Sequence, residues 1–172
     1  MAGTLAALDP RPRVLVSGSA VGYYGIRGDE VLTEESSRGR GFLADVADQW
    51  EAAAAPATRA GIRTVSLRTG IVLSARGGAL APLLRLFRLG LGGRLGPGTR
   101  WWSWIALADE VGVIRHALTH DSVRGPVNAT RGLTEEVALA GQRALPTVAE
   151  TTGYRFRHPD LRDALRAVLA PS

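Results

Sequence analysis

The stretch Arg13-Val-Leu-Val-Ser17, followed by Gly18, decides how the chain is expected to fold. It is a short run of apolar, mostly β-branched residues with Pro10 and Pro12 ahead of it. This pattern is typical of a buried strand that ends in a loop at the glycine. Because loops at strand ends often carry functional side chains, we expect chemistry just after Ser17.

A helix and a second strand follow this strand. The helix is predicted to end at about Arg59, with Gly61 as its terminator. Its predicted buried face consists of apolar residues at helical spacing: Phe42, Val46, Trp50, Ala53 and Ala57. The segment from Ile62 to Arg68 then alternates as a strand does and is reached by a very short turn. A strand–helix–strand crossover places its two strands parallel, so the sequence predicts an α/β fold with a parallel sheet.

Two helices and a long loop are predicted for the middle of the chain. An apolar helical stripe is formed by Leu80, Leu83, Leu84 and Phe87. The glycines between Gly90 and Gly98 predict a long loop before the tryptophan cluster. The segment from Leu107 to Thr119 predicts a helix with Asp109 near its N-terminus, where a carboxylate suits the helix dipole. Its expected inward residues are Val111, Ile114 and Leu118.

The C-terminal part is expected to be mainly helical. A last short strand is predicted at Pro126 to Asn128, and a weaker helix from Leu133 to Arg143. Pro159 is expected to open a final helix in its first turn. One face of that helix carries Leu161, Ala164, Leu165, Val168 and Leu169.

The composition narrows the function classes. The chain has 172 residues, a net charge of +5 and no cysteine, which excludes disulfides and thiolate nucleophiles. It contains no lysine, so all 21 basic residues are arginines, and they are scattered singly among acidic residues. This distribution does not favour a nucleic-acid-binding surface. The tryptophan cluster consists of Trp101, Trp102 and Trp104. Its stacking on single-stranded nucleic acid, together with Arg94 and Arg100, remains the less favoured use.

Metal binding, secretion and membrane insertion are not expected. The three histidines, at positions 116, 120 and 158, are isolated from acidic clusters of ligand spacing. The segment from Met1 to Arg13 lacks the basic start and long apolar run of a signal peptide. The most apolar stretch, from Leu80 to Leu95, is interrupted by arginines and glycines, so it does not predict a membrane span. We therefore expect a cytoplasmic protein.

One motif and several segments in order resemble a known family. The motif Ser17-Gly-Ser-Ala-Val-Gly-Tyr-Tyr-Gly25 resembles the serine loop after the fifth strand of extended short-chain dehydrogenase/reductases. Segments similar to the atypical epimerase family protein subgroup are Phe42-Leu with Trp50-Glu51, Arg68-Thr-Gly-Ile-Val-Leu73, Gly77-Gly-Ala-Leu80, Phe87-Arg-Leu-Gly-Leu-Gly-Gly93 and Trp102-Ser-Trp-Ile105. Segments that resemble its small C-terminal domain of unknown function are Gly141-Gln-Arg-Ala-Leu-Pro146 and Gly153-Tyr-Arg-Phe-Arg-His-Pro159.

The resemblance implies a fold and a boundary. Residues 1–130 would form the C-terminal, substrate-side part of an NAD(P)-binding, Rossmann-like, doubly wound parallel sheet with two to three strands. Residues 131–172 would form the small, mainly helical C-terminal domain. The family's Gly-rich dinucleotide turn does not occur in the sequence, because the glycines from Gly90 to Gly98 follow a predicted helix rather than a strand. We therefore expect the N-terminal dinucleotide-binding segment to be missing. The stretch between Asn128 and Gly132 is also shorter than in the family.

The resemblance also implies site residues. Ser19 matches the catalytic serine, whereas the positions of the family's tyrosine and lysine hold Trp50 and Ala54. Tyr23 is therefore the candidate proton donor. Cofactor contacts are implied for Ser17, Gly18, Arg68, Thr69, Gly70, Ile71 and Val72. Substrate contacts are implied for Tyr24, Arg94, Trp102 and Trp104. The alternatives are a serine bonded only within its turn, an Arg68 salt bridge that caps a strand, and core packing of at least one tryptophan.

Two functional hypotheses remain open at this point. The resemblance implies an NAD(P)-dependent oxidoreductase or epimerase, with NADP as the expected cofactor and a small, nucleotide-sugar-like substrate. The alternative is a catalytically inactive binding or structural module. A sheet cut at the fifth strand would expose an unpaired edge, so we expect a homo-oligomer or pairing with a separately encoded N-terminal half. We do not expect the chain to bind the cofactor alone.

Overall fold

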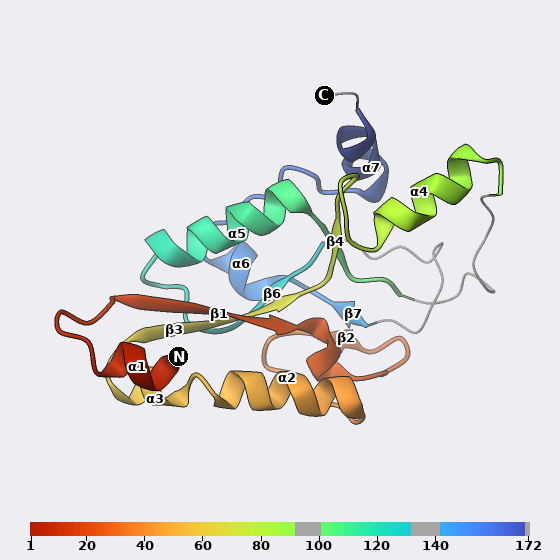
Figure 1. The fold of residues 1–172 in the computed structure, drawn as a ribbon. Helices are drawn as coiled ribbons and strands as arrows, with labels where there is room; N and C mark the ends of the chain where they lie inside the picture. The colour runs from red at the N-terminus through yellow and green to blue at the C-terminus, as the bar shows by residue number, and fades with distance from the viewer. Residues whose placement is uncertain (92–100, 132–141, 171–172) are drawn as a thin grey trace.

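A three-stranded parallel sheet forms the centre of the computed structural model, which describes residues 1–91, 101–131 and 142–170 (Figure 1). Its strands are β1 (Val14–Ala20), β3 (Arg63–Thr69) and β6 (Gly125–Ala129), in the order β1-β3-β6. The predicted parallel pair and the predicted last strand are thereby confirmed. The register places Ser19 beside Arg68, and Arg68 beside Asn128.

Two smaller parallel pairs complete the strands of the described residues. β4 (Ile71–Leu73) pairs with β5 (Trp104–Ala106), and β2 (Val31–Leu32) pairs with β7 (Arg143–Ala144). The sequence did not predict β2, β4, β5 or β7, because two or three residues are too few to show a period. β7 begins at Arg143, where a helix was expected to end. The rest of that predicted helix lies outside the described residues.

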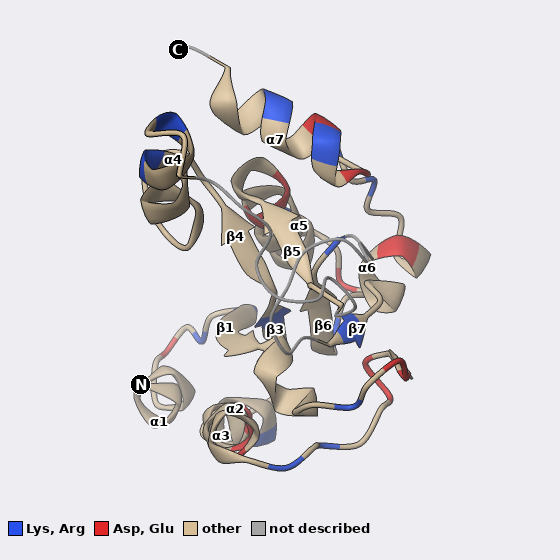
Figure 2. Cartoon of the chain, turned by 90° about the vertical axis from the view of Figure 1, so that its right-hand side faces the viewer, with Lys and Arg blue, Asp and Glu red and all other residues tan. Residues whose placement is uncertain are grey.

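Helices lie on both sides of the central sheet (Figures 1 and 2). On one side are α1 (Ala2–Ala6), α2 (Phe42–Ala52) and α3 (Ala55–Arg59). On the other are α4 (Leu80–Arg88), α5 (Leu107–Thr119), α6 (Thr147–Thr151) and α7 (Leu161–Leu169). A short 3₁₀ turn, η1 (Val21–Tyr24), follows β1. No helix of the described part is long and apolar enough to cross a membrane.

The predicted helix from residue 42 to 59 is divided into α2 and α3, and its predicted buried face is confirmed at Ala57 but wrong at Phe42 and Trp50. Pro56, in the first turn of α3, lacks the N–H that a continuous helix needs. Phe42 is 78% exposed and Trp50 55% exposed. The buried residues of the two helices and their connection are Ala44, Ala47, Ala54 and Ala57. These small side chains let the helices pack closely on the sheet, and Glu51 then lies beside the strands.

The bounds of α5 match the prediction, but its inward face does not. Val111 and Leu118, expected inside, are 49% and 47% exposed, whereas Val113 and Ala117 are buried. Compared with the prediction, α5 is rotated about its axis, because polar residues of this helix also point inward. Asp109 is fully buried. A pattern that places charged residues outside cannot anticipate this rotation.

Three apolar clusters hold the described elements together. The smallest contains Val21, Tyr24, Leu32 and Ala144, and the other two include residues of α4 to α7. The larger one lies between β3, β6 and α5 and contains Val65, Leu67, Ile105, Val113, Ala117, Val123, Val127, Ala129 and Ala149. The second contains Leu73, Leu80, Trp104, Ala106 and Ala164, with Leu161, Leu165 and Val168 packed against it. It therefore joins β4 and β5 to α4 and α7. The final helix is confirmed, with Asp160 as its cap: the Asp160 side chain accepts a hydrogen bond of 2.9 Å from the Asp163 amide. Pro159 lies just before this cap rather than in the first turn.

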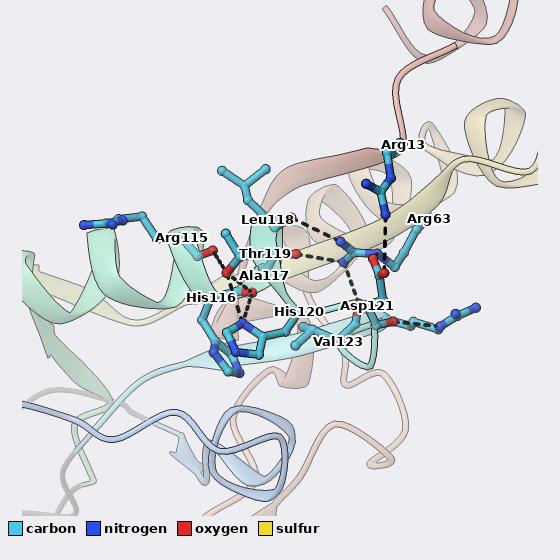
Figure 3. A network of polar contacts seen from close by, with 11 residues as sticks. Arg13, Arg63, Arg115, His116, Ala117, Leu118, Thr119, His120, Asp121 and Val123 are labelled. Carbon is cyan, nitrogen blue, oxygen red and sulfur yellow. Dashed lines mark hydrogen bonds and ion pairs between the residues drawn. The ribbon is translucent and has the colours of Figure 1, made fainter. Parts of the chain in front are cut away.

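Arg63, the first residue of β3, caps the C-terminus of α5 (Figure 3). Its Nη1 donates to the carbonyl oxygens of Ala117 at 2.7 Å and Val123 at 2.9 Å, and its Nη2 donates to that of Leu118 at 3.4 Å. Its Nε lies 3.5 Å from Oδ1 of Asp121. The last carbonyls of a helix have no partner within the helix, so Arg63 supplies partners that would otherwise be missing.

Replacing Arg63 by methionine should lower the free energy of unfolding by about 2 kcal/mol, because buried carbonyls would lose their donors. Urea denaturation of the variant and the parent chain measures this difference. The control is Arg59→Met at an exposed position of α3, which should change the value by less than about 0.5 kcal/mol. Equal effects of the two substitutions would contradict the capping role.

Candidate functional site

Ser19 lies within β1 rather than in the loop where it was expected. β1 continues to Ala20 because it pairs with β3 residue by residue as far as Thr69. Ser19 is 7% exposed, and its Oγ donates a hydrogen bond of 2.7 Å to Oε1 of Glu51. The serine proton is therefore directed at a carboxylate of α2. The lone pairs of Oγ remain able to accept a hydrogen bond.

Arg68 is the centre of the polar contacts around Ser19. Its Nε and Nη2 donate to the two carboxylate oxygens of Glu51, at 2.8 and 2.9 Å. Its Nη1 donates to the Tyr24 hydroxyl at 2.9 Å and to the Glu34 carbonyl at 3.4 Å. Burial opposes the charge of Arg68, but the hydrogen bonds to Glu51 and Tyr24 outweigh it, so its pKa is raised. With all three nitrogens engaged, Arg68 positions its neighbours. The Glu51 ion pair is the salt bridge considered as the alternative to a cofactor contact.

Tyr24 belongs to the core, which corrects its expected place in a substrate pocket. The side chain is fully buried, and its hydroxyl donates to Oδ1 of Asn128 at 2.7 Å while it accepts from Arg68. Burial raises the pKa of Tyr24, even though Arg68 acts to lower it. Both hydrogen-bonding directions of this phenol are used inside the protein.

Tyr23 presents its ring to the same guanidinium. The Arg68 carbon Cζ lies 3.5 Å from the centroid of the Tyr23 ring, and the rings of Tyr23 and Tyr24 meet edge to face at 5.5 Å. A guanidinium over an aromatic face is a favourable cation–π contact. Among the described residues, no hydrogen-bond partner is found for the Tyr23 hydroxyl. Tyr23 is half-buried, and its phenol is available to a ligand.

Glu34 and Asn128 complete the network, and sequence reasoning missed both. Oε1 of Glu34 accepts from the amides of Asn128 at 3.0 Å and Val148 at 3.1 Å. The Asn128 side-chain amide donates to the Leu145 carbonyl at 2.8 Å. The network therefore connects β1, α2, β3 and β6 to the start of α6. A polar residue inside the short apolar strand 125–129 was a usable signal for Asn128, whereas Glu34 lies in a polar stretch without a pattern.

The segment predicted to close over a cofactor mostly bonds within the protein. The Thr69 hydroxyl donates to Oε1 of Glu110 at 2.9 Å, and the amides of Gly70 and Ile71 donate to the carbonyls of Ala129 and Ser103 at 2.9 and 2.8 Å. A Cβ on Gly70 would lie 2.7 Å from the Ser103 carbonyl oxygen. The close approach that requires glycine at position 70 is thus that of Ser103, the residue before β5.

The remaining predicted site residues lie at different places in the chain. Gly18 is exposed on β1 with no atom within 4 Å of the place of a Cβ, and its neighbour Ser17 is half-buried. Val72 pairs with Ile105 in the β4–β5 sheet. Trp104 is fully buried among core residues, which corrects its expected place on a pocket wall. Trp102 is half-buried, and Arg94 lies outside the described residues.

Comparisons with known proteins give this geometry a family context. Residues 129–168 match a family model described as a domain of unknown function, DUF1731. An epimerase family protein of Mycobacterium bovis is 36% identical over 195 residues, which cover 93% of this chain and 65% of that protein. The crystal structure of a nucleoside-diphosphate sugar epimerase from Corynebacterium glutamicum is 40% identical, with a TM-score of 0.89, over 98% of this chain and 40% of that chain.

The chain belongs to the epimerase family proteins.

A human member of this family has also been solved, with NADPH. The structure of epimerase family protein SDR39U1 (isoform 2) is 27% identical, with a TM-score of 0.89, over 97% of this chain and 68% of that chain. The Rossmann-like α/β fold expected from the sequence is confirmed by these neighbours. The chain spans about two thirds of the length of the M. bovis epimerase family protein, 65%.

Glu110 gives this epimerase family chain a testable pH dependence. Burial raises the pKa of Glu110 above its ordinary value of 4.5, although the Thr69 hydroxyl acts to lower it. The folded state therefore holds this proton more tightly than the unfolded state. The stabilisation that comes from the proton on Glu110 is complete below pH 4.5 and is lost as the pH rises through the folded-state pKa.

Replacing Glu110 by glutamine should therefore raise stability relative to the parent at neutral pH, with a difference that shrinks towards pH 4. A glutamine keeps an oxygen for the Thr69 hydroxyl but has no charge to desolvate. Thermal melts from pH 4 to 8 measure the difference. The control Glu35→Gln, at an exposed position, should show no such trend. A Glu110→Gln variant that is less stable than the parent at every pH would contradict the claim that the buried Glu110 charge is destabilising.

Replacing Arg68 by methionine should lower the free energy of unfolding by about 3 to 5 kcal/mol, because the partly buried Glu51 carboxylate loses its partner. The control Arg40→Met removes an exposed arginine and should have little effect. Urea denaturation compares the two variants. A loss below about 1 kcal/mol for Arg68→Met would mean that the pair contributes no more than an ordinary surface salt bridge.

Proposed function

We propose that this chain is the substrate-side part of an NAD(P)-dependent oxidoreductase or epimerase of the short-chain dehydrogenase/reductase type. Ser19 contacts a substrate oxygen, and Tyr23 exchanges the proton. The substrate is a small hydroxyl compound of nucleotide-sugar type. The observation that carries this proposal is the joint orientation of Ser19 and Tyr23 by one buried ion pair, Glu51 with Arg68, at the carboxyl end of β1.

The chemistry assigned to each residue follows from its contacts. Ser19 Oγ donates a hydrogen bond to Glu51, so its lone pairs can accept a hydrogen bond from a substrate hydroxyl. The Tyr23 ring rests on the Arg68 guanidinium in a cation–π contact, which fixes the position of the ring. A nicotinamide bound here would take the hydride from the hydroxyl carbon, and Tyr23 in its phenolate form would take the hydroxyl proton and become the neutral phenol. This assignment replaces the tyrosine–lysine pair, for which the chain has no lysine.

The residues present fit only one end of a dinucleotide. At the carboxyl ends of parallel strands, Ser17, Gly18 and the exposed side of β1 offer room for the nicotinamide end, and Gly18 has open space above its backbone. The pyrophosphate needs a Gly-rich turn that opens a helix after a strand, and the sequence contains none. Human SDR39U1 was solved with NADPH, so we favour NADP as the cofactor.

A dinucleotide-binding segment of the family type is the proposed partner of the open side of β1. β1 is the edge of the described central sheet, and Phe42 and Leu43 of the neighbouring helix are 78% and 67% exposed. Open strand edges and clustered exposed apolar side chains mark surfaces that are covered in the working protein. The same surface favours the second candidate, a binding module without catalysis, because it needs no reactive group.

Titration of the 172-residue chain with NADPH and NADH, alone and mixed with the Gly-rich part of a related epimerase family protein, tests the cofactor proposal. Nicotinamide fluorescence reports binding. We expect binding in the mixture only, with NADPH bound more tightly than NADH. Tight binding by this chain alone would overturn the need for a partner segment, and binding in neither case would favour the non-catalytic module.

Replacing Ser19 by alanine in that mixture tests the catalytic proposal. Reduction of NADP⁺ on addition of nucleoside-diphosphate sugars is the readout, and the variant should be slower by about 100-fold, the scale of a lost hydrogen bond to the reacting oxygen. Binding of NADPH should change little. The control Ser122→Ala lies at an exposed position after α5. A rate equal to that of the control would exclude Ser19 from the reaction.

A further inference from the structure

A groove lined by basic residues lies on the side of the sheet opposite to Ser19. It has a volume of about 1110 Å³ and is bordered by α5, the C-terminal end of α7, the segment 154–158 and residues next to α4. In both views α4, α5 and α7 lie together, away from α1, α2 and α3 (Figures 1 and 2). Since Ser19 and Arg68 face Glu51 of α2, the groove is separate from the site described above.

The charge of the groove has one sign. Its cationic and imidazole side chains are Arg76, Arg88, Arg115, Arg155, Arg157, His116, His120 and His158, and the described residues that line it include no Asp or Glu. In the described parts of the chain, none of these five guanidinium groups forms an ion pair. Figure 3 shows the Arg115 side chain extending away from the contacts around Arg63 and Asp121. Positive charges that lie near one another repel, so an anion bound in the groove would offset the electrostatic repulsion among these arginines.

A buried carboxylate fixes the arginine-bearing segment in place. Asp109 is fully buried and accepts hydrogen bonds from the amides of Arg157 at 2.8 Å and His158 at 3.0 Å. It also accepts from the Tyr154 hydroxyl at 3.0 Å, and burial followed by the nearby Asp109 charge raises the pKa of Tyr154. A Cβ on Gly112 would lie 2.1 Å from that hydroxyl oxygen, so α5 needs glycine there to meet the segment.

The alternation of side chains along this segment sets the direction of its arginines. Tyr154 and Phe156 turn towards the main core and meet edge to face at 4.9 Å. Arg155 and Arg157, at the intervening positions, are exposed. The backbone that carries these two arginines is therefore fixed, which lowers the cost of ordering an anion site there.

An apolar wall lies beside the charges. Leu107 and Val111 of α5 and Leu169 of α7 line the groove and are 47%, 49% and 45% exposed. Val111 is one of the α5 residues that the sequence had placed in the core. A ligand that covers them would bury apolar area while its anionic group meets the arginines.

We propose that this groove binds an organic phosphate, with the phosphate held by Arg115 and Arg157 and the organic part against Leu107, Val111 and Leu169. The segment 154–158 lies within residues 129–168, so the proposal gives a ligand to the domain of unknown function. It goes beyond the proposed oxidoreductase activity and does not depend on it.

Titration of the 172-residue chain with inorganic pyrophosphate, ADP and hexyl phosphate, followed by the amide resonances of Gly112, Arg157 and His158, tests the proposal. We expect saturable shifts with all three probes. Tighter binding of ADP than of pyrophosphate identifies a nucleotide as the source of the phosphate, and tighter binding of hexyl phosphate identifies a lipid-like phosphate. Absence of saturable binding by every probe overturns the proposal.

The double variant Arg115→Gln/Arg157→Gln should weaken binding by tenfold or more, because charge-assisted contacts to phosphate are lost. The control Arg11→Gln/Arg59→Gln removes the same charge at exposed positions outside the groove and should change binding by less than about twofold. Equal weakening in the two double variants would mean diffuse attraction and overturn the site. NADPH titration of both variants with the Gly-rich partner separates this result from the oxidoreductase proposal, which predicts no change.

Discussion

The two-pronged ion pair between Arg68 and Glu51 is the interaction on which the candidate site depends. It ties β3 to α2 across the face of the sheet, orients Ser19 through the shared carboxylate, and provides the cation on which Tyr23 rests. A guanidinium that is 3% exposed is tolerated only because its N–H groups find acceptors. The positions of both tyrosines follow from the position of this one side chain.

Strong periodicity allowed part of the fold to be predicted. The parallel pair β1 and β3 came from β-branched runs joined by an apolar helix, and α4, α5 and α7 came from stripes at helical spacing. The inward faces of α2 and α5 were wrong for a common reason. Each helix buries a carboxylate whose partner is distant in the chain: Arg68 for Glu51, and the amide of Arg157 for Asp109. Periodicity contains no information about such partners.

The site was predictable where local motif and chemistry coincide. Ser19 and Tyr23 were identified from the serine motif, whereas Glu34, Glu51 and Asn128 were not, because their roles exist only after β1, β3 and β6 assemble. Gly70 was expected to permit a close approach, and it does, but to the Ser103 carbonyl. Position and chemical type were thus readable from the sequence, while the contacting partner was not.

The sheet separates two polar arrangements of different character. On the α2 side, Arg68 and Glu51 form an ion pair beside Ser19, and on the α5 side, the arginines around the groove with its apolar wall form no ion pair with any described residue. A carboxylate organises each side: the partly buried Glu51 on one and the fully buried Asp109 on the other. Elements of the C-terminal segment take part in both, through Leu145 and Val148 on one side and Tyr154 to His158 on the other.

The most direct test of the central claim is a double-mutant cycle with Arg68→Met, Glu51→Gln and the combined variant, with unfolding free energies from urea denaturation. If the pair organises the site as described, the two substitutions should be coupled by at least about 2 kcal/mol, since each leaves the other group unpaired. Additivity within about 0.5 kcal/mol would show that Arg68 and Glu51 act independently, and would contradict the account.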